Sequence, residues 1–427
     1  MKFRKSRHRE AGQAIVEYAL ILALIASAAL GVLSTVGENT GGVLRSVSET
    51  LGGREQRWDT SDEARASEPV MSKMDFRNRL TTLGVKTTIT SLEFTDADAP
   101  GGAYDISLNR DGSVMMWLTG DGKACHISSC RKGIRIRPDN VSSLFNGMSA
   151  LTDLDLEGLD TYGMTSMNAM FKSCTSLQEL DLSSLDTSAV TDMISMFSAC
   201  TALEELDLSS FDTSAVTAMN AMFYEDSALR TVNLSSFDTS NVSAMYNMFY
   251  SCSSLERLDL SSFDSSSTTG ISGMFYGCRS LAELDMSNFR AEHVTAMTTA
   301  FMNCSSLREL DLSSFATSSA TATGDMFAGC TSLEKLDISA MDTSNVTYIS
   351  SMFGSCNKLA EIKLGPAFSF RGSASTACRL PTPSASKITP PEGCTVTGLW
   401  YNESGTGFAP ADVPDNTAGT YYAYCRA

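Results

Sequence analysis

The chain has 427 residues, a net charge of −17 and a pI of about 4.6. This length exceeds what one small core needs, and the acidic balance argues against a nucleic-acid partner, because such a partner requires a basic surface. The three histidines, His8, His126 and His293, are scattered and no phosphate-binding or dinucleotide-binding glycine motif occurs, so we expect neither a cofactor nor an enzymatic activity.

The amino-terminal segment combines a basic start with a long apolar run. Residues 2–9 hold five Lys or Arg side chains, and residues 14–36 are almost entirely apolar. About 23 helical residues span about 35 Å, which is enough to cross a bilayer, and the basic flank predicts that the rest of the chain lies outside the cell. A secretory signal peptide cut before Ala29 and a plain membrane anchor are alternative interpretations. Glu17 within this run indicates a function or a partner, because a carboxylate in lipid is costly.

The same segment resembles the leader of type IV prepilins of the Flp/Tad kind. Gly12 is followed by the letters QAIV, then by Glu17 and Tyr18, and then by the apolar run. The resemblance implies that a prepilin peptidase cleaves after Gly12, that the mature chain starts at Gln13, and that Glu17 faces the amine of a neighbouring subunit. Flp pilins are small, so the large remainder of this chain departs from their pattern and favours a minor tip or decorating subunit.

Self-similarity dominates the chain from residue 141 to residue 365. A Met-Phe or Ala-Phe pair and a Leu-x-Leu pair recur every 26 residues, and we name each such repeat a rung. An unbroken period of this kind predicts a solenoid, because one rung cannot bury its own apolar face. The phenylalanines that mark the nine rungs are Phe145, Phe171, Phe197, Phe223, Phe249, Phe275, Phe301, Phe327 and Phe353.

Each rung contains two patterns. LxxLDLS alternates with period two and predicts a short strand, stacked in parallel on its neighbours at about 5 Å. VTxMxxMFxxCxxL spaces apolar residues by three and four and predicts a helical turn on the outer side, with its Met and Phe in the core. The predicted fold class is therefore an α/β repeat solenoid with short parallel strands.

The repeated sequence motif LDLSSFDTSxVTxMxxMFxxCxxL closely resembles the BspA-like leucine-rich repeats of bacterial surface proteins. The resemblance implies display at the cell surface and adhesion to host or microbial proteins, without catalysis. The flanking segments look like the strand-rich unit and the small C-terminal unit that often accompany such arrays. The predicted divisions are a leader at 1–12, a pilin-like helix at 13–48, a linker at 49–75, a strand-rich lead-in at 76–140, repeats at 141–365, a Pro/Ser-rich linker at 366–391 and a C-terminal β unit at 392–427.

An aspartate stands between the two leucines of most rungs. In a strand with inward leucines it points outward, where stacked carboxylates repel one another. These residues form either a stripe that binds a cation or a basic partner, with calcium as a weak candidate, or a solvated stripe that only aids solubility. This ladder consists of Asp155, Asp181, Asp207, Asp259, Asp285, Asp311 and Asp337, and Glu179, Glu205, Arg257, Glu283, Glu309 and Lys335 extend the candidate binding surface on the concave face.

Two further columns follow the period. The aspartate of FDTS is expected to cap a turn by accepting hydrogen bonds from nearby backbone amides. The cysteines of the rungs are expected to be buried thiols, with disulfides between stacked neighbours as the alternative. An oxidising exterior would also allow a Cys125–Cys130 bond and one C-terminal pair. The turn aspartates are Asp186, Asp212, Asp238, Asp264 and Asp342, and the column cysteines are Cys174, Cys200, Cys252, Cys278, Cys304, Cys330 and Cys356, with Asp226 at the skipped position.

Together these patterns predict a cell-surface adhesin or interaction module that a pilin-like helix displays. The expected partners are a host or microbial surface protein, the prepilin peptidase and pilin subunits, and the membrane through residues 14–36. The alternative is a minor pilin or pseudopilin that serves an assembly machine, with the repeats as a spacer.

Overall fold

The computed structural model describes residues 58–59, 61–374 and 377–425. The predicted leader and pilin-like helix, with Gly12, Gln13, Glu17 and Tyr18, lie outside these residues. Trp58 begins a compact unit that extends to the carboxyl terminus. Among the residues described here, no helix has the length and apolar character that a membrane crossing requires.

The first part of this unit is a small lead-in. Residues 58–59 and 61–75, which the sequence places in a linker, are folded: α3 starts after Ser61 and α4 after Ser72, and each serine side chain accepts a backbone N–H of the first turn. Its elements are α3 (Asp62–Ala66), β1 (Val70–Met71), α4 (Lys73–Thr82), β2 (Ser91–Thr95), β3 (Tyr104–Asp105), β4 (Met115–Leu118), β5 (Ala124–Ser128) and β6 (Arg137–Pro138).

The lead-in sheet joins the repeats without a break. Its strand order is β3-β4-β5-β2-β7, in which β7 belongs to the first rung. β2 and β7 pair in parallel with Leu92 opposite Leu154, so the leucine pattern of the rungs continues into the lead-in.

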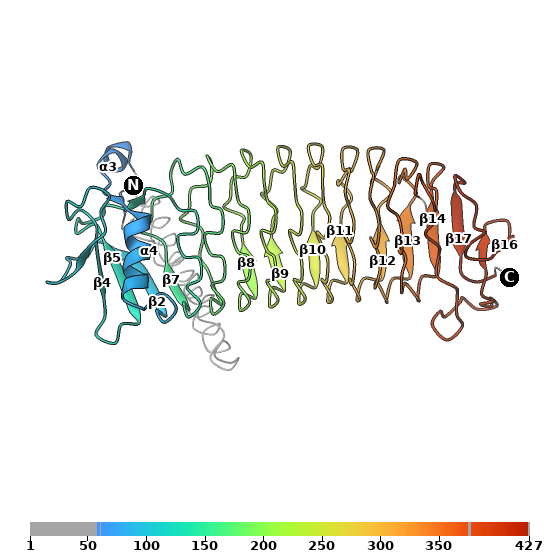
Figure 1. The fold of residues 1–427 in the computed structure, drawn as a ribbon, viewed down its shortest axis with the longest axis horizontal. Helices are drawn as coiled ribbons and strands as arrows, with labels where there is room; N and C mark the ends of the chain where they lie inside the picture. The colour runs from blue at the N-terminus through green and yellow to red at the C-terminus, as the bar shows by residue number, and fades with distance from the viewer. Residues whose placement is uncertain (1–57, 60, 375–376, 426–427) are drawn as a thin grey trace, which may run out of the picture. The chain divides into compact units, whose positions relative to one another are not determined.

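Short parallel strands follow one another along the repeats in chain order (Figure 1). Where neighbouring strands pair, the register advances by one rung, as for Leu258 opposite Leu284. The strand prediction is confirmed in eight rungs, whereas the rung of Leu180 carries no regular strand. The strands are β7 (Asp153–Asp155), β8 (Glu205–Asp207), β9 (Thr231–Asn233), β10 (Arg257–Asp259), β11 (Glu283–Asp285), β12 (Glu309–Asp311), β13 (Lys335–Ile338) and β14 (Glu361–Leu364).

The segment that was expected to be helical is a run of turns, so this prediction is wrong. Its backbone visits positive φ twice in most rungs, as at Ala169 (53°) and Ser173 (60°), and positive φ cannot continue a right-handed helix. Alternate N–H groups bond to the next rung, as Phe171 N does to Met196 O at 2.9 Å. The N–H groups between them close tight turns, as Cys174 N does to Phe171 O at 3.1 Å. Bonding between rungs therefore replaces bonding within a helix. We name this segment the turn side.

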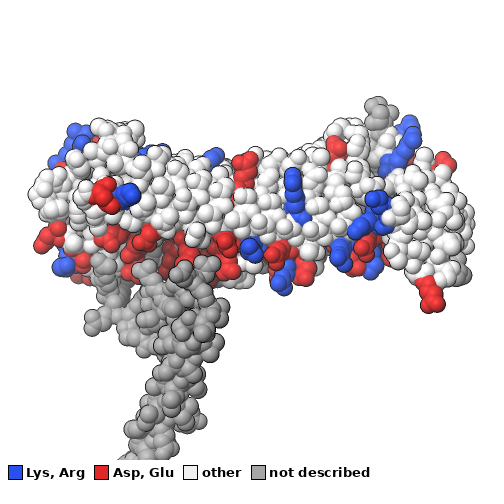
Figure 2. All heavy atoms as spheres, turned by 90° about the horizontal axis from the view of Figure 1, so that it is seen from below, with Lys and Arg blue, Asp and Glu red and all other residues white. Residues whose placement is uncertain are grey.

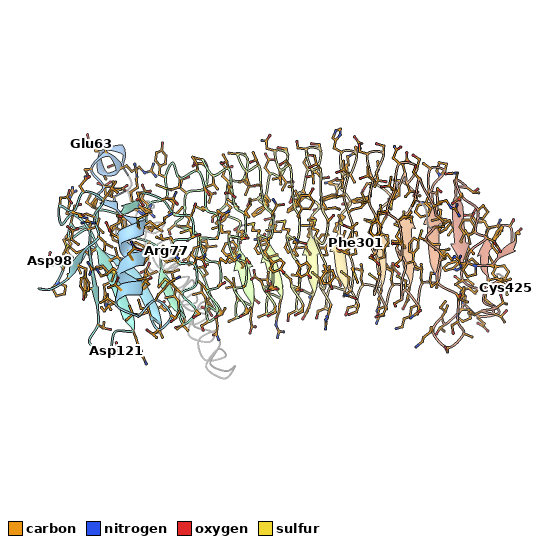
Figure 3. The ribbon with its side chains drawn as sticks, in the orientation of Figure 1. Glu63, Arg77, Asp98, Asp121, Phe301 and Cys425 are labelled. Atoms are coloured by element: carbon orange, nitrogen blue, oxygen red, sulfur yellow. The ribbon has the colours of Figure 1, made fainter. Side chains whose placement is uncertain are left out.

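The phenylalanines form a buried column along the array, and Phe301 lies within it (Figure 3). Consecutive rings from Phe145 to Phe353 stack with centroids 5.2–5.9 Å apart. The expected core role of these residues is confirmed.

The cysteines form a second buried column. All twelve cysteines of the chain are free thiols, so the Cys125–Cys130 bond that the sequence allowed is not formed. Each column thiol donates a hydrogen bond to the carbonyl of a phenylalanine in the preceding rung, as Cys252 Sγ does to Phe223 O at 3.0 Å. Burial raises the pKa of Cys174 to about 12, so the thiol form is favoured. The expected burial is confirmed, and the bonded partner is a carbonyl rather than a second sulfur.

The two ends of the array are covered differently. At the first rung no preceding rung exists to donate N–H groups, and the Arg77 guanidinium of α4 donates instead to the carbonyls of Ser143, Leu144 and Asn146 (Figure 3). At the last rung β14 pairs antiparallel with β17 (Gly419–Tyr422), which pairs with β15 (Trp400–Asn402), and β16 (Gly407–Phe408) closes the sheet.

The Pro/Ser-rich segment at 366–391 is packed against this end. Phe368 and Phe370 are buried, and the Phe368 ring lies 6.5 Å from that of Phe353. Trp400 donates its indole N–H to the carbonyl of Pro381 at 3.0 Å. The predicted linker and C-terminal β unit therefore close the array together, because their aromatic side chains cover the last rung.

Candidate interaction face

The strands β7 to β14, together with residues 178–181 of the rung that lacks a regular strand, lie side by side along the array. Their outward side chains form one continuous surface, which we name the strand face. The inward side chains of the strands are buried or, for Val232 and Leu284, partly buried, and the residues beside them are turned to solvent, as in the exposed–buried–exposed pattern of Glu205, Leu206 and Asp207. Period-two alternation in a one-sided sheet produces this division. The strand face is thus the surface on which the sequence varies without disturbing the core.

The predicted aspartate ladder lies on this face. Five of its members are exposed, and Asp155 and Asp337 are half-buried. Each carboxylate accepts the backbone N–H of the residue two positions later, as Asp285 does from Ser287 at 2.9 Å and Asp311 does from Ser313 at 2.8 Å. The ladder therefore shapes the turn that ends each strand, a role that the sequence interpretation gave only to the FDTS aspartates. The second oxygen accepts no hydrogen bond from a described residue except in Asp337, where Lys363 Nζ lies 2.9 Å from Oδ2.

The FDTS aspartates do what was expected of them. Asp212 accepts the backbone N–H of Ser214 at 3.0 Å and its hydroxyl at 2.6 Å. The following threonine links rungs, because Thr213 donates to the carbonyl of Asp238 at 2.9 Å and accepts the N–H of the same residue at 2.8 Å. Turn capping is confirmed for this column.

Hydrogen bonding keeps several carboxylates charged. The Ser209 backbone N–H lowers the pKa of Asp207, and the side chain and backbone of Ser261 lower that of Asp259. A lowered pKa means that these groups stay negative to more acidic pH than free carboxyls do. The strand face therefore carries a persistent negative charge.

Charge is distributed unevenly along the face. From the fourth rung on, every rung except that of β11 brings a Lys or Arg to the strand or to the residue before it. Three of these side chains lie beside a carboxylate of the preceding rung: Arg230 Nε is 3.7 Å from Glu204 Oε2, Lys335 Nζ is 2.7 Å from Glu309 Oε1, and Lys363 Nζ is 2.9 Å from Asp337 Oδ2. The first three rungs bring no Lys or Arg to the same positions, and their carboxylates are Asp153, Asp155, Glu179, Asp181, Glu204, Glu205 and Asp207. Figure 2 shows the same trend, with acidic side chains gathered in the N-terminal half and basic ones among them further along.

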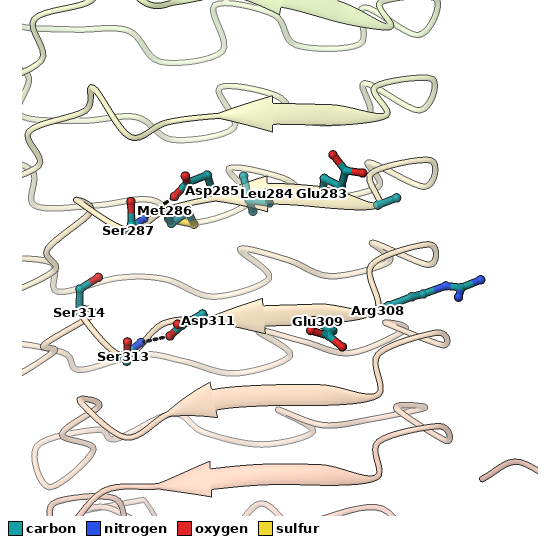
Figure 4. A pocket seen from close by; sticks show the side chains of 11 residues that line it. Glu283, Leu284, Asp285, Met286, Ser287, Arg308, Glu309, Asp311, Ser313 and Ser314 are labelled. Carbon is teal, nitrogen blue, oxygen red and sulfur yellow. Dashed lines mark hydrogen bonds between the residues drawn. The ribbon is translucent and has the colours of Figure 1, made fainter. Parts of the chain in front are cut away.

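A hollow of about 560 Å³ opens on the face between β11 and β12 (Figure 4). These two strands belong to different sheets, whereas β11 pairs with β10 and β12 pairs with β13. Glu283, Asp285, Glu309 and Asp311 line the hollow together with Arg308. The ladder aspartates point their second oxygens toward solvent here, beside one guanidinium.

The structure brings the predicted binding residues together as one face and adds members that the sequence interpretation missed. Glu204 and Arg230 lie 3.7 Å apart at its edge, and Arg308 borders the hollow. Aligning every rung on its leucines would have found these positions, because they precede the strand by one residue. In the part of the chain with described coordinates, no three His, Cys, Asp or Glu side chains are grouped to hold a metal ion.

Two solved structures resemble the chain in part. A leucine-rich repeat protein of T. pallidum matches 49% of this chain and 90% of its own length, with 18% identity and a TM-score of 0.28. A leucine-rich cell surface protein of Faecalibacterium prausnitzii matches 68% of this chain and 97% of its own length, with 17% identity and a TM-score of 0.24. No curated protein matches the chain.

A family model matches the repeats three times in overlapping segments. The matched residues are 139–231, 202–310 and 280–364, which together cover 139–364, or 226 of the 427 residues. More than half of the sequence is therefore accounted for by one family. The chain belongs to the family described as Mycoplasma protein of unknown function, DUF285.

Proposed function

We propose that this protein is a protein-interaction module that binds a basic surface of a partner protein through its strand face. The observation that carries the proposal is the charge division of that face. Five of the last six rungs bring a Lys or Arg to the face and the first three bring none, and Asp153, Glu179 and Glu205 form no ion pair within the described residues. Such an acidic surface attracts a basic partner and raises its rate of association.

We further propose that the module acts at the bacterial surface as an adhesin. The basic start, the apolar run and Glu17 support display through a pilin-like N-terminal helix, and the resemblance of the rungs to BspA-like repeats supports adhesion to host or microbial proteins. In this proposal the prepilin peptidase and pilin subunits are processing and assembly partners.

A deletion experiment tests the adhesin role. Cells that carry the chain without residues 141–365 should lose attachment to host or companion cells and keep normal filaments in electron micrographs. Attachment at the wild-type level would contradict the adhesin role. Loss of filaments without a loss of attachment would favour the alternative, a minor pilin with a structural role in assembly.

A charge experiment tests the face itself. The triple variant Asp153→Asn, Glu179→Gln, Glu205→Gln removes three carboxylates of the first rungs, and we expect attachment to fall and to lose part of its salt dependence. The matched control, Glu283→Gln, Glu309→Gln, Glu361→Gln, removes three carboxylates from the later rungs. An equal effect of the two triples would show that total charge acts rather than the first rungs.

A further inference from the structure

The strand face does not end at the first rung. Across the lead-in sheet, Asp155 of β7 lies opposite Glu93 of β2, Glu93 lies opposite His126 of β5, and His126 lies opposite Trp117 of β4. Residues directly opposite in a sheet project from the same side. The row of ladder positions therefore continues through a carboxylate and a histidine to a tryptophan.

The two aromatic residues at the end of this row are held in place. The Trp117 and His126 rings stack with centroids 5.2 Å apart and an interplanar angle of 14°. His126 Nδ1 is 2.8 Å from Glu93 Oε1, and this bond fixes the imidazole behind the indole. Little side-chain freedom remains to be lost on binding, which favours an anchor position in an interface.

Trp117 is also the accessible tryptophan among the three of the chain. Trp58 and Trp400 are 7% and 0% exposed, whereas Trp117 is half-buried. Its ring has His126 on the β5 side, and on the β3 side it lines a hollow of about 200 Å³ beside the turn formed by residues 100–103. Small side chains form this turn, so a group from outside can reach the indole.

The negative charge around Trp117 favours a cationic side chain of the partner over a neutral or acidic one. Glu93 is 47% exposed, and the row continues from it through Asp155, Asp181 and Asp207, the ladder carboxylates of the first three rungs, which form no ion pair within the described residues. A tryptophan face attracts a cation through its ring quadrupole, and flanking carboxylates add to that attraction. A neutral or acidic partner would gain nothing from these carboxylates.

From this arrangement we infer that Trp117 is the anchor of the docking surface and receives a Lys or Arg side chain of a basic partner protein, while Glu93 and Asp155 bind neighbouring basic residues. The inference rests on the proposed function and deepens it. It places the strongest contact on the lead-in, outside the repeats, and it names the chemistry of the partner.

The test measures the affinity of the full-length protein, in detergent micelles, for a fluorescein-labelled peptide of alternating Gly and Arg by fluorescence polarisation. Trp117→Ala should weaken binding about tenfold, which corresponds to about 1.4 kcal/mol for a desolvated cation on an indole. Trp117→Phe retains a ring and should weaken it less. A peptide with citrulline in place of arginine should bind the wild type more weakly than the arginine peptide binds Trp117→Ala, because it also loses the attraction to Glu93 and Asp155.

The control variant Asp285→Asn, Asp311→Asn removes carboxylates from the distant hollow between β11 and β12. It should change the affinity by less than twofold at physiological salt, because exposed charges at that distance are screened. Equal affinities of the wild type and Trp117→Ala would overturn the inference, and so would a control that weakens binding as much as Trp117→Ala. Neither result touches the deletion experiment, so the anchor can fail while the interaction role stands.

Discussion

The turn side and the strand face are built on the same 26-residue period, yet they use it in opposite ways. On the turn side the same side chains recur, and Phe223, Phe249 and Phe275 stack with centroids 5.2 and 5.8 Å apart. On the strand face the ladder aspartate recurs in most rungs, but the residue two positions before it changes, and Glu205 is followed by Thr231 and Arg257 at equivalent positions. Repetition therefore serves stacking, and variation is confined to the surface that meets solvent.

This difference teaches where to look for function in a repeat protein. A buried column whose side chains contact only one another has to repeat the same residue type, because each rung packs directly on the next. A face whose members touch solvent is free to acquire charge, aromatic side chains and hollows. Four predictions test the comparison, in order of decreasing effect.

The largest effect is expected at the centre of the phenylalanine column. Phe249→Ala removes a ring that contacts both neighbouring rungs, and we expect a loss of about 3–5 kcal/mol in the free energy of unfolding. Urea denaturation followed by circular dichroism measures it. Tyr250→Ala, which removes a partly exposed ring stacked 4.8 and 4.4 Å from its neighbours, should cost only about 1 kcal/mol. Equal costs would contradict the division between interior and surface.

The cap of the first rung comes next. Arg77→Met removes the guanidinium that donates to three backbone carbonyls, and we expect a loss of about 2–3 kcal/mol, because hydrogen bonds to a charged group are strong and the Leu144 and Asn146 carbonyls lose their donor. Arg79→Met, on the same helix, only removes a guanidinium over the Tyr104 ring and should cost about 0.5–1 kcal/mol. Hydrogen exchange at the first rung would show whether the damage is local.

Asp226 breaks the cysteine column, and its replacement should stabilise the protein. The side chain is fully buried and its Oδ2 has no hydrogen-bond partner, so burial raises its pKa well above the ordinary value. A raised pKa in the folded state means that the stability contributed by protonation is complete at low pH and is lost as pH rises. Asp226→Cys should therefore add about 1–3 kcal/mol at neutral pH.

The pH dependence provides the control for Asp226. Asp226→Asn keeps the shape of the side chain and cannot ionise, so thermal unfolding of this variant should depend less on pH than that of the wild type between weakly acidic and neutral pH. If the wild type and Asp226→Asn lost stability in parallel as pH rises, Asp226 would not be the group responsible.

The smallest effect is expected on the strand face. Asp259→Ala removes the acceptor of the Ser261 N–H and should cost about 0.5 kcal/mol at neutral pH. Its pKa is lowered in the folded state, so its contribution is present above pH 4 and is lost as pH falls below that value. Asp259→Asn retains an acceptor and should show neither the loss nor its pH dependence. Melting temperatures at neutral and acidic pH measure both.

The sequence by itself predicted much of the architecture. The 26-residue step of Phe171 and its equivalents, and the alternation around Leu206, predicted nine stacked rungs, a buried column and short parallel strands. Periods of this kind are informative because a repeated contact imposes the same residue type at the same position in every rung. The exposed side of each strand followed from the same alternation.

The backbone conformation of the turn side could not be predicted from the periodicity of its residues. Spacings of three and four around Phe171 favour a helix in isolation, yet Ala169 and Ser173 adopt positive φ and donate their own N–H groups to carbonyls of the next rung. The partners of a backbone N–H are set by what lies beside it, and the neighbouring rung is visible only in the folded chain.

The candidate site divides in the same manner. The aspartate ladder was legible in the sequence, because Asp259 and its equivalents keep the period. The row that joins Asp155 to Glu93, His126 and Trp117 was not, because these residues lie on strands that are separated in sequence and are joined by tertiary pairing. The sequence determined the local periods and the composition of each column. Only the tertiary structure decided which columns meet, since side-by-side pairing of strands depends on the path of the whole chain.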